Sequence, residues 1–230
     1  MRYFLGMLIL ILATPIFAAS QTTQQFIQKI APLAQSRNAQ ILQNRQKLLN
    51  LYHQFKAGKQ LGTSNWEWVD GIAHYYGLKK PDFTKDATWK KLLDRVNVIP
   101  TSLVVAQAAM ESAWGRSRFA KQANNFFGQH CYTKGCGLVP KRASNAGFYV
   151  QSFPDAQAAV NSYMHNLNTQ RSYADLRGIR SNLAQKNSVI SGRALATGLQ
   201  HYSELDGYSK HIQNIIAKYK LSSYDNSFHS

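Results

Sequence analysis

The sequence contains few acidic residues and almost no glutamate. It has 27 lysines and arginines against 11 aspartates and glutamates in 230 residues, and its three glutamates are Glu67, Glu111 and Glu204. No acidic residue occurs between Glu111 and Asp155. The resulting formal net charge of +16 predicts that the protein collects on anionic polymers, unless the charge serves only solubility.

The motifs of several common enzyme classes are also missing. There is no glycine-rich phosphate-binding loop, no His-Glu-x-x-His zinc motif and no Gly-x-Ser-x-Gly nucleophile turn. We therefore expect the site to contain neither a cofactor nor a metal ion.

Cysteine is limited to Cys131 and Cys136, which lie five positions apart with Gly135 available for a turn. In an oxidising compartment this pair would form a small disulfide loop. His130 precedes the pair, but a zinc site needs more ligands and no second cysteine pair exists. A thiol nucleophile formed by Cys131 and His130 is the alternative interpretation.

The N-terminus has the pattern of a secretory signal peptide over residues 1–19. Arg2 is followed by a nearly unbroken apolar run from residue 3 to 17 and then by small residues. This pattern predicts an exported protein of the periplasm or cell envelope. An uncleaved membrane anchor is the alternative, although the run is only marginally long enough to span a bilayer.

The remaining chain is predicted to be mainly helical, and its 44% hydrophobic content is enough for a core. Residues 20–61 lack glycine up to Gly58 and predict a helical arm of one or two helices. Residues 62–221 form the main domain, with a β-like or irregular lobe at 124–153 and helices again at 154–220. A polar, flexible tail is expected at 222–230.

A helix is predicted to begin at Pro100 and Thr101, with Thr101 as its cap, and to end at Gly115. Gln107 and Glu111 share one stripe of this largely apolar helix. Burial and the C-terminal helix dipole both raise the pKa of a carboxyl at that position, which makes Glu111 a candidate general acid. A capping or ion-paired glutamate is the alternative.

Two stretches, AQAAMESAWG at 106–115 and NNFFG at 124–128, resemble the signature of glycoside hydrolase family 73. These enzymes are endo-β-N-acetylglucosaminidases that cleave peptidoglycan, and the resemblance is closest to their exported Bax-type branch. Further matching stretches are residues 98–103, 131–140, 163–168 and 202–208. The resemblance covers residues 62–221 and implies a lysozyme-like, mainly α fold with a small β-lobe, with Glu111 as the catalytic acid.

The sequence departs from the family pattern at one catalytic position. The family places a second acidic residue in the β-lobe, at a position that aligns near Ala146, and no carboxylate occurs there. Participation of the substrate's 2-acetamido group would make one acid sufficient, and we favour this account. There are two other accounts. Asp155 reaches the cleft, or the protein binds the glycan without cleaving it efficiently.

The resemblance also directs attention to other site residues. Tyr202 is expected to orient the acetamido group or a water, with Tyr208 as a weaker candidate for the same task. Gln107, Asn125 and Phe127 are expected to contact substrate. Core packing is the alternative for the tyrosines and turn formation is the alternative for Asn125. Lysines and arginines around the cleft are expected to hold the anionic peptide stems of the polymer.

Three other functions compete with a glucosaminidase. They are a non-catalytic peptidoglycan-binding protein, a lytic transglycosylase that also uses one glutamate, and an exported basic protein that binds nucleic acid. We expect no nucleic-acid partner, because an exported protein rarely meets one. The sequence gives no indication of a protein partner. A glycoprotein chitobiose core would require the same chemistry as peptidoglycan.

Overall fold

The computed structural model describes residues 15–140, 147–199, 202 and 206–225, with side chains from residue 22 onward. The first element is α1 (Pro15–Lys56), a single helix of 42 residues. The predicted arm is therefore one helix, which ends where Gly58 adopts a left-handed φ of 71°. Most of the predicted signal peptide, residues 1–14, lies outside the described residues.

Helices dominate the rest of the chain, as predicted. The elements after α1 are α2 (Thr63–Tyr75), α3 (Asp86–Arg95), α4 (Thr101–Ser112), α5 (Arg118–Ala123), β1 (His130–Cys131), β2 (Gly137–Leu138), β3 (Tyr149–Gln151), α6 (Ala156–Thr169), η1 (Arg171–Tyr173), α7 (Ala174–Gln185), α8 (Gly192–Ala196), α9 (Tyr208–Lys218) and η2 (Leu221–Tyr224). Across the described ranges we find no helix with the length and apolar character needed to traverse a bilayer.

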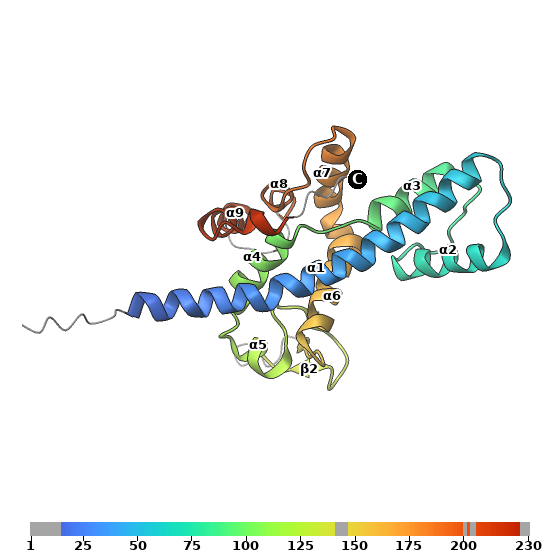
Figure 1. The fold of residues 1–230 in the computed structure, drawn as a ribbon. Coiled ribbons are helices and arrows are strands. Elements are labelled where there is room, and N and C mark those ends of the chain that lie inside the picture. The colour runs from blue at the N-terminus through green and yellow to red at the C-terminus, as the bar shows by residue number, and fades with distance from the viewer. Residues whose placement is uncertain (1–14, 141–146, 200–201, 203–205, 226–230) are drawn as a thin grey trace, which may run out of the picture.

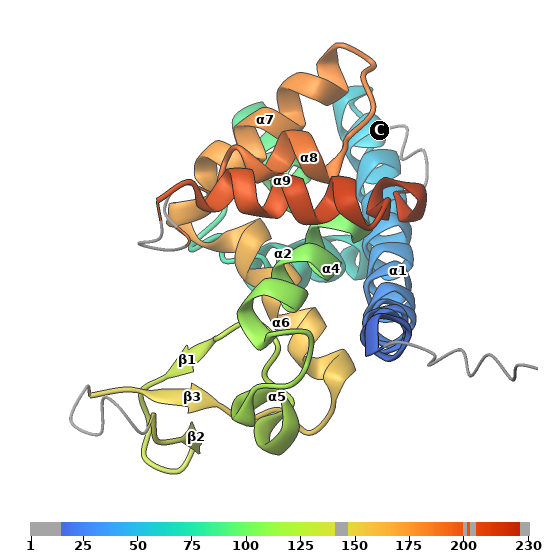
Figure 2. The same ribbon diagram turned by 90° about the vertical axis from the view of Figure 1, so that its left-hand side faces the viewer.

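The main core surrounds α4, which packs against α1, α8, α9 and η2. Figure 2 shows α4 in the middle, with α7, α8 and α9 above it and α5 and the sheet below it. All but two of the twelve residues of α4 are buried. The N-terminal half of α1 supplies Phe26, Ile27 and Ile30 to this same core, so it packs on the main domain.

A second core lies at the other end of α1, where α2 and α3 pack (Figure 1). Its centre is Trp89, whose ring lies 5.3 Å from that of Phe55 and 5.9 Å from that of Trp66. Most aromatic residues of this region therefore form core contacts. Because α1 contributes to both cores, it fixes the α2–α3 lobe to the domain that contains α4.

Buried arginines join the two cores at the segment between α3 and α4. Arg180, on α7, is fully buried and donates hydrogen bonds to the carbonyls of Asp94, Val98 and Asn97 and to the Asn168 amide oxygen. Burial lowers its pKa to about 9, so the guanidinium is still protonated at neutral pH. The arginine thus supplies the hydrogen bonds that this non-helical, buried backbone cannot make internally.

The N-terminus of α4 is capped by the far end of the chain. Thr101 was predicted as the cap, but Pro100 occupies the N-cap position and has no side-chain donor or acceptor. Asp225 takes over this role, since its carboxylate accepts hydrogen bonds from the Ser102 N–H at 2.8 Å, the Ser102 hydroxyl and the Gly192 N–H. Residues 222–225 are therefore held against the domain, unlike the expected flexible tail, and 226–230 lie outside the described residues.

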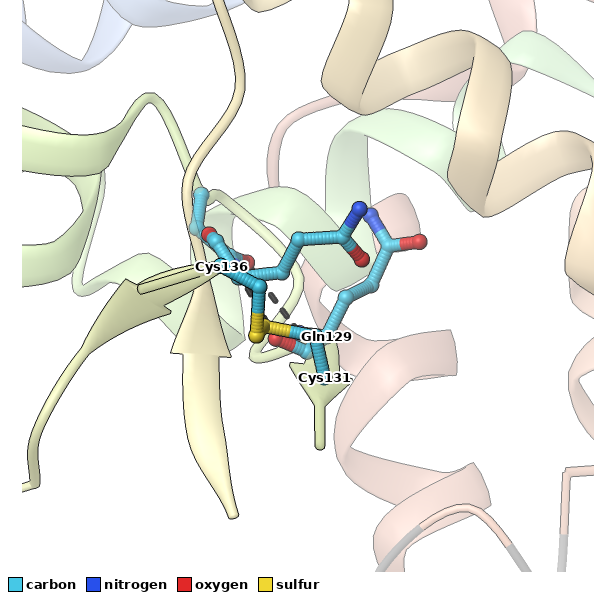
Figure 3. Close-up of a disulfide and its surroundings, with 5 residues drawn as sticks. Gln129, Cys131 and Cys136 are labelled. Carbon is cyan, nitrogen blue, oxygen red and sulfur yellow. Dashed lines mark hydrogen bonds between the residues drawn. A yellow bond between two sulfur atoms is a disulfide. The ribbon is translucent and has the colours of Figure 1, made fainter. Parts of the chain in front are cut away.

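The predicted β-lobe is a three-stranded antiparallel sheet in the order β1–β3–β2. The register pairs His130 with Val150 on one side and Leu138 with Val150 on the other. The predicted disulfide between Cys131 and Cys136 is present, with Cα atoms 6.2 Å apart, and joins β1 to the residue before β2 (Figure 3). It closes the short connection between β1 and β2, with a sequence separation of five.

Replacing Arg180 with leucine should destabilise the protein strongly. The substitution leaves several buried carbonyls without donors, and each such loss costs about 1–3 kcal/mol, so we expect a fall of at least about 3 kcal/mol in the free energy of unfolding. Urea unfolding followed by circular dichroism measures it. The exposed Arg193→Leu is the control and should change stability by less than about 0.5 kcal/mol. Equal effects of the two substitutions would contradict the role given to Arg180.

Candidate active site

Glu111 lies in the last turn of α4, at the C-terminal end of a mostly buried helix, as predicted. Its side chain is half-buried and lines a surface cavity of about 510 Å³. Desolvation by burial raises the pKa of the Glu111 carboxyl above its ordinary value, and this is the larger of the two influences on it. A carboxylic acid in such a place retains its proton to higher pH than an exposed one.

The turn after Glu111 has an unusual backbone. Ala113, Trp114 and Gly115 are consecutive and all have left-handed φ values, of 50°, 59° and 76°. Packing holds this turn, because the Trp114 ring lies between those of Phe26 and Tyr219, at 5.7 and 4.6 Å. A Cβ at Gly115 would come within 3.1 Å of the Phe26 ring. Trp114 is therefore packed against the core and supports the turn that follows Glu111.

A chain of hydrogen bonds from three helices ends on Glu111. The Tyr208 hydroxyl, on α9, donates to Glu111 Oε1 at 2.7 Å. Gln107, one turn before Glu111 on α4, donates from Nε2 to that hydroxyl at 3.1 Å. The Tyr163 hydroxyl, on α6, donates in turn to Gln107 Oε1. Every donor in this chain points toward the carboxyl group, which fixes its orientation.

The protonation states agree with this direction of donation. Burial raises the pKa of the Tyr208 and Tyr163 hydroxyls well above the usual tyrosine value, so both keep their protons. The hydrogen bond from Tyr208 stabilises the ionised form of Glu111 and opposes the pKa increase that burial causes. The balance still leaves the pKa of Glu111 raised.

Tyr202 contacts the loop after α5 and the ring of Tyr208. Its hydroxyl donates to the Phe127 carbonyl oxygen at 2.8 Å, and its ring stacks on that of Tyr208 at 5.3 Å. Tyr202 lines the cavity beside Glu111, but among the described contacts it is Tyr208 that touches the carboxyl. The role expected of Tyr202 in orienting the acetamido group or a water stays a prediction.

The loop after α5 uses Asn125 to hold its own backbone. Asn125 is buried, its Nδ2 donates to the carbonyls of Gln129 and Gln151, and its Oδ1 accepts from the N–H groups of Phe127 and Gln129. These bonds occupy the amide fully, which corresponds to the turn-forming alternative. Phe127 is also buried, with its ring stacked on Tyr163 at 4.0 Å.

The loop brings its backbone close to the Glu111 carboxyl group. Gly128 lines the cavity with a left-handed φ of 67°, and a Cβ there would lie 3.9 Å from Glu111 Oε2. Glycine therefore keeps the second carboxyl oxygen open to the cavity. The remaining wall comes mainly from polar and aromatic residues of the β-lobe and the end of α6: Gln129, His130, Tyr132, Asn166, Gln170 and Tyr173.

Gln129 connects the β-lobe to α6 on the far side of the cavity. Its Oε1 accepts from Ser162 and Asn166, and its Nε2 donates to the Ala159 carbonyl. Figure 3 shows Gln129 beside the disulfide, with its side chain extending from the sheet toward the helices. Gln129, Asn166 and Tyr163 were not predicted as site residues. Tyr163 and Asn166 do lie in the stretch 163–168, which was noted only for its resemblance.

Glu111 is the only carboxylate among the described residues that line the cavity. Asp155 caps α6, where its Oδ1 accepts from the Ala158 N–H at 2.7 Å, and it does not line the cavity. The position near Ala146 lies outside the described residues. Within the described ranges, no group of three or more potential ligands could hold a metal ion. Cys131 is oxidised, which removes the thiol-nucleophile alternative.

Comparison with known proteins relates this chain to a protein family and to two curated relatives. The family model for glucosaminidases, described as mannosyl-glycoprotein endo-beta-N-acetylglucosaminidase, matches residues 86–221. The chain is 32% identical over 178 residues to Protein bax of Escherichia coli (strain K12), covering 77% of this chain and 62% of that protein. It is 29% identical over 141 residues to the exo-glucosaminidase LytG of Bacillus subtilis (strain 168), covering 58% and 49%.

The matches therefore span less than two thirds of the length of either curated relative. Among solved structures, the catalytic domain of the autolysin Auto from Listeria monocytogenes aligns with a TM-score of 0.47 and 16% sequence identity. That alignment covers 95% of this chain and 100% of the other.

Tyr208→Phe should raise the pKa of Glu111 further. The Tyr208 hydroxyl donates to the ionised carboxylate, so its removal destabilises the charged form while burial continues to act. Titration of glutamate carboxyl carbons by ¹³C NMR measures the shift, and Glu111→Gln assigns the signal among only three glutamates. Tyr224→Phe is the control and should leave the titration unchanged. An unchanged or lowered pKa in Tyr208→Phe would contradict the hydrogen-bond chain.

Proposed function

Because this chain belongs to the glucosaminidase family, we propose that it is an exported endo-β-N-acetylglucosaminidase that cleaves the β-1,4 bond after N-acetylglucosamine in peptidoglycan. The observation that carries the proposal is the half-buried Glu111, with a raised pKa, facing a cavity. The family description supports internal cleavage of the glycan. The signal-like pattern of residues 1–19 and the disulfide support export.

Glu111 acts as the general acid. Its proton passes to the glycosidic oxygen as the bond from that oxygen to the anomeric carbon breaks, and the departing sugar leaves with a new hydroxyl. A raised pKa keeps this proton available near neutral pH, and the descending limb of the pH–rate profile reports its loss. Tyr208 and Gln107 position the acid and hold the carboxylate that remains after transfer.

The substrate supplies the second reacting group. The carbonyl oxygen of the 2-acetamido group bonds to the anomeric carbon as the leaving oxygen departs. Water then attacks the same carbon, the bond to the acetamido oxygen breaks, and the water's proton returns to Glu111. This sequence needs one carboxyl group, in agreement with the single carboxylate among the described lining residues.

The cavity wall suits a neutral amino sugar. Amide side chains of Gln129, Asn166 and Gln170 and the ring of Tyr173 line it, and such groups hydrogen-bond or stack on sugars. Tyr202 holds the Phe127 backbone and covers the Tyr208 ring, and we assign it to orienting the acetamido group from there.

Glu111→Gln should abolish hydrolysis. Glutamine preserves the shape of the side chain but has no acidic proton, so the rate on purified peptidoglycan should fall by at least about 100-fold. Counting new reducing ends and identifying the terminal sugar measures both rate and specificity. Release of N-acetylglucosamine ends by the wild type supports the proposal. Anhydro-muramic products would establish a lytic transglycosylase, and binding without any product would establish a non-catalytic protein.

Glycan from which the acetyl groups have been removed should resist cleavage. Loss of the acetamido carbonyl removes the group that attacks the anomeric carbon, so the rate should drop about as far as it does in Glu111→Gln. Paired digestion of one glycan preparation before and after deacetylation measures this. Re-acetylation is the control and should restore cleavage. Equal rates on the two glycans would show that water, positioned by the protein, attacks directly.

A further inference from the structure

A second cavity, also of about 510 Å³, lies in the α2–α3 lobe. Its wall includes four lysines, Lys79, Lys80, Lys85 and Lys91, and one acidic residue, Asp82. All four lysines are exposed. We call this cavity the lysine pocket. It takes no part in the reaction proposed above, and three of its four lysines precede the segment that the family model matches.

Most of the positive charge in the lysine pocket is not neutralised by the protein. Asp82 pairs with Lys85 at 3.1 Å. Lys79, Lys80 and Lys91 form no ion pair with any residue in the described part of the chain. Three like charges around one cavity repel each other, and an anion bound between them would relieve that repulsion.

The backbone that forms the lysine pocket includes two residues in the left-handed conformation. Gly77 and Lys80 both adopt left-handed φ values, of 73° and 48°. For a residue with a side chain, such as Lys80, that conformation costs about 1–2 kcal/mol, so the surrounding structure must hold it. The buried Leu78 and the hydrogen bond from Arg95 to the Tyr76 carbonyl fasten the segment to the second core.

One residue that lines the lysine pocket contacts the end of α6, next to the catalytic cavity. Gln170 lines the catalytic cavity, and a Cβ at Gly77, which lines the lysine pocket, would lie 4.0 Å from the Cβ of Thr169. The rings of Tyr75 and His165, at 4.6 Å, make a second contact between α2 and α6. These contacts place the turn after α2 against α6, one residue from Gln170 of the catalytic cavity.

Among the residues that the structure describes, the lining of the catalytic cavity contains no lysine or arginine that could bind the charged part of the substrate. Lysines and arginines were expected around the cleft, yet its described lining residues include neither. Peptidoglycan carries carboxylates on its peptide stems, whereas its sugars next to the scissile bond are neutral. Each cavity therefore suits one part of the polymer. The described lining of the catalytic cavity is polar without lysine or arginine and suits the sugars, and the basic lysine pocket suits the stem carboxylates.

We propose that the lysine pocket binds the carboxylates of peptide stems on the glycan strand that occupies the catalytic cavity. The inference rests on the proposed function. It assigns to the α2–α3 lobe a role in substrate recognition, separate from the cleavage that the domain around α4 performs.

Binding of the full-length chain to intact peptidoglycan tests this assignment. The inactive Glu111→Gln protein carries in addition either Lys79→Gln, Lys80→Gln and Lys91→Gln or, as a control with the same net charge, Lys59→Gln, Lys186→Gln and Lys210→Gln, which are exposed lysines elsewhere. The polymer is purified free of phosphate-bearing polymers. Co-sedimentation should show about fivefold weaker binding for the pocket variant, equivalent to about 1 kcal/mol, and little change for the control.

The same glycan after enzymatic removal of its stems distinguishes stem recognition from general attraction. The pocket variant and the control should bind stem-free strands equally. Equal losses by both variants on intact polymer, or an undiminished loss of the pocket variant on stem-free strands, would overturn the assignment. Reducing-end release from stem-free strands by the active protein tests the cleavage proposal separately, because that measurement does not depend on the lysines.

Discussion

The burial of one carboxyl group at the end of α4 is the constraint on which the site depends. An unpaired charge in such a place is costly, and the C-terminal helix dipole adds to that cost, so the group favours its protonated form. Among the described residues that line the cavity, no lysine or arginine offsets this penalty. The protein provides the Tyr208 hydroxyl, a neutral donor that stabilises the ionised form less than a positive charge would. Glu111 can therefore hold a proton and also release it.

Orientation of this carboxyl requires the rest of the helical domain. Tyr208 comes from α9, Tyr163 from α6 and the ring of Phe26 from α1, and each contributes to the α4 surroundings. The opposite end of α4 is fixed by Asp225, and the preceding segment by Arg180. Both ends of the helix are thus tied by side chains from distant parts of the sequence, which gives the acid a rigid base.

The local features of the site could be predicted from the sequence, and the long-range ones could not. The spacing of Gln107 and Glu111 places both on one face of a helix, and the composition of that helix predicts its burial. The cysteine spacing predicts the disulfide. The Tyr208–Glu111 bond spans 97 positions and the Tyr163–Gln107 bond spans 56, so they follow from how the helices pack, which no local pattern encodes. For the same reason the sequence favours Tyr202 over Tyr208 as a site residue and predicts that Asp225 lies in a flexible tail of residues 222–230.

Acid catalysis and recognition of an anionic polymer make opposite demands on the same cleft. A lysine within about 4–6 Å of Glu111 would attract the stem carboxylates, but it would also lower the pKa of the acid by about 1–3 units and remove the proton that cleavage needs. The four lysines of the lysine pocket do not line the catalytic cavity, and screening in water weakens the effect of charges outside the cavity on the pKa of Glu111. The helix α1 makes this separation possible, because it carries the α2–α3 lobe on the same rigid element that packs against α4. Under the two proposals, a strand held at both places would meet the acid in one register, whereas a basic catalytic cavity would gain affinity at the expense of the reaction.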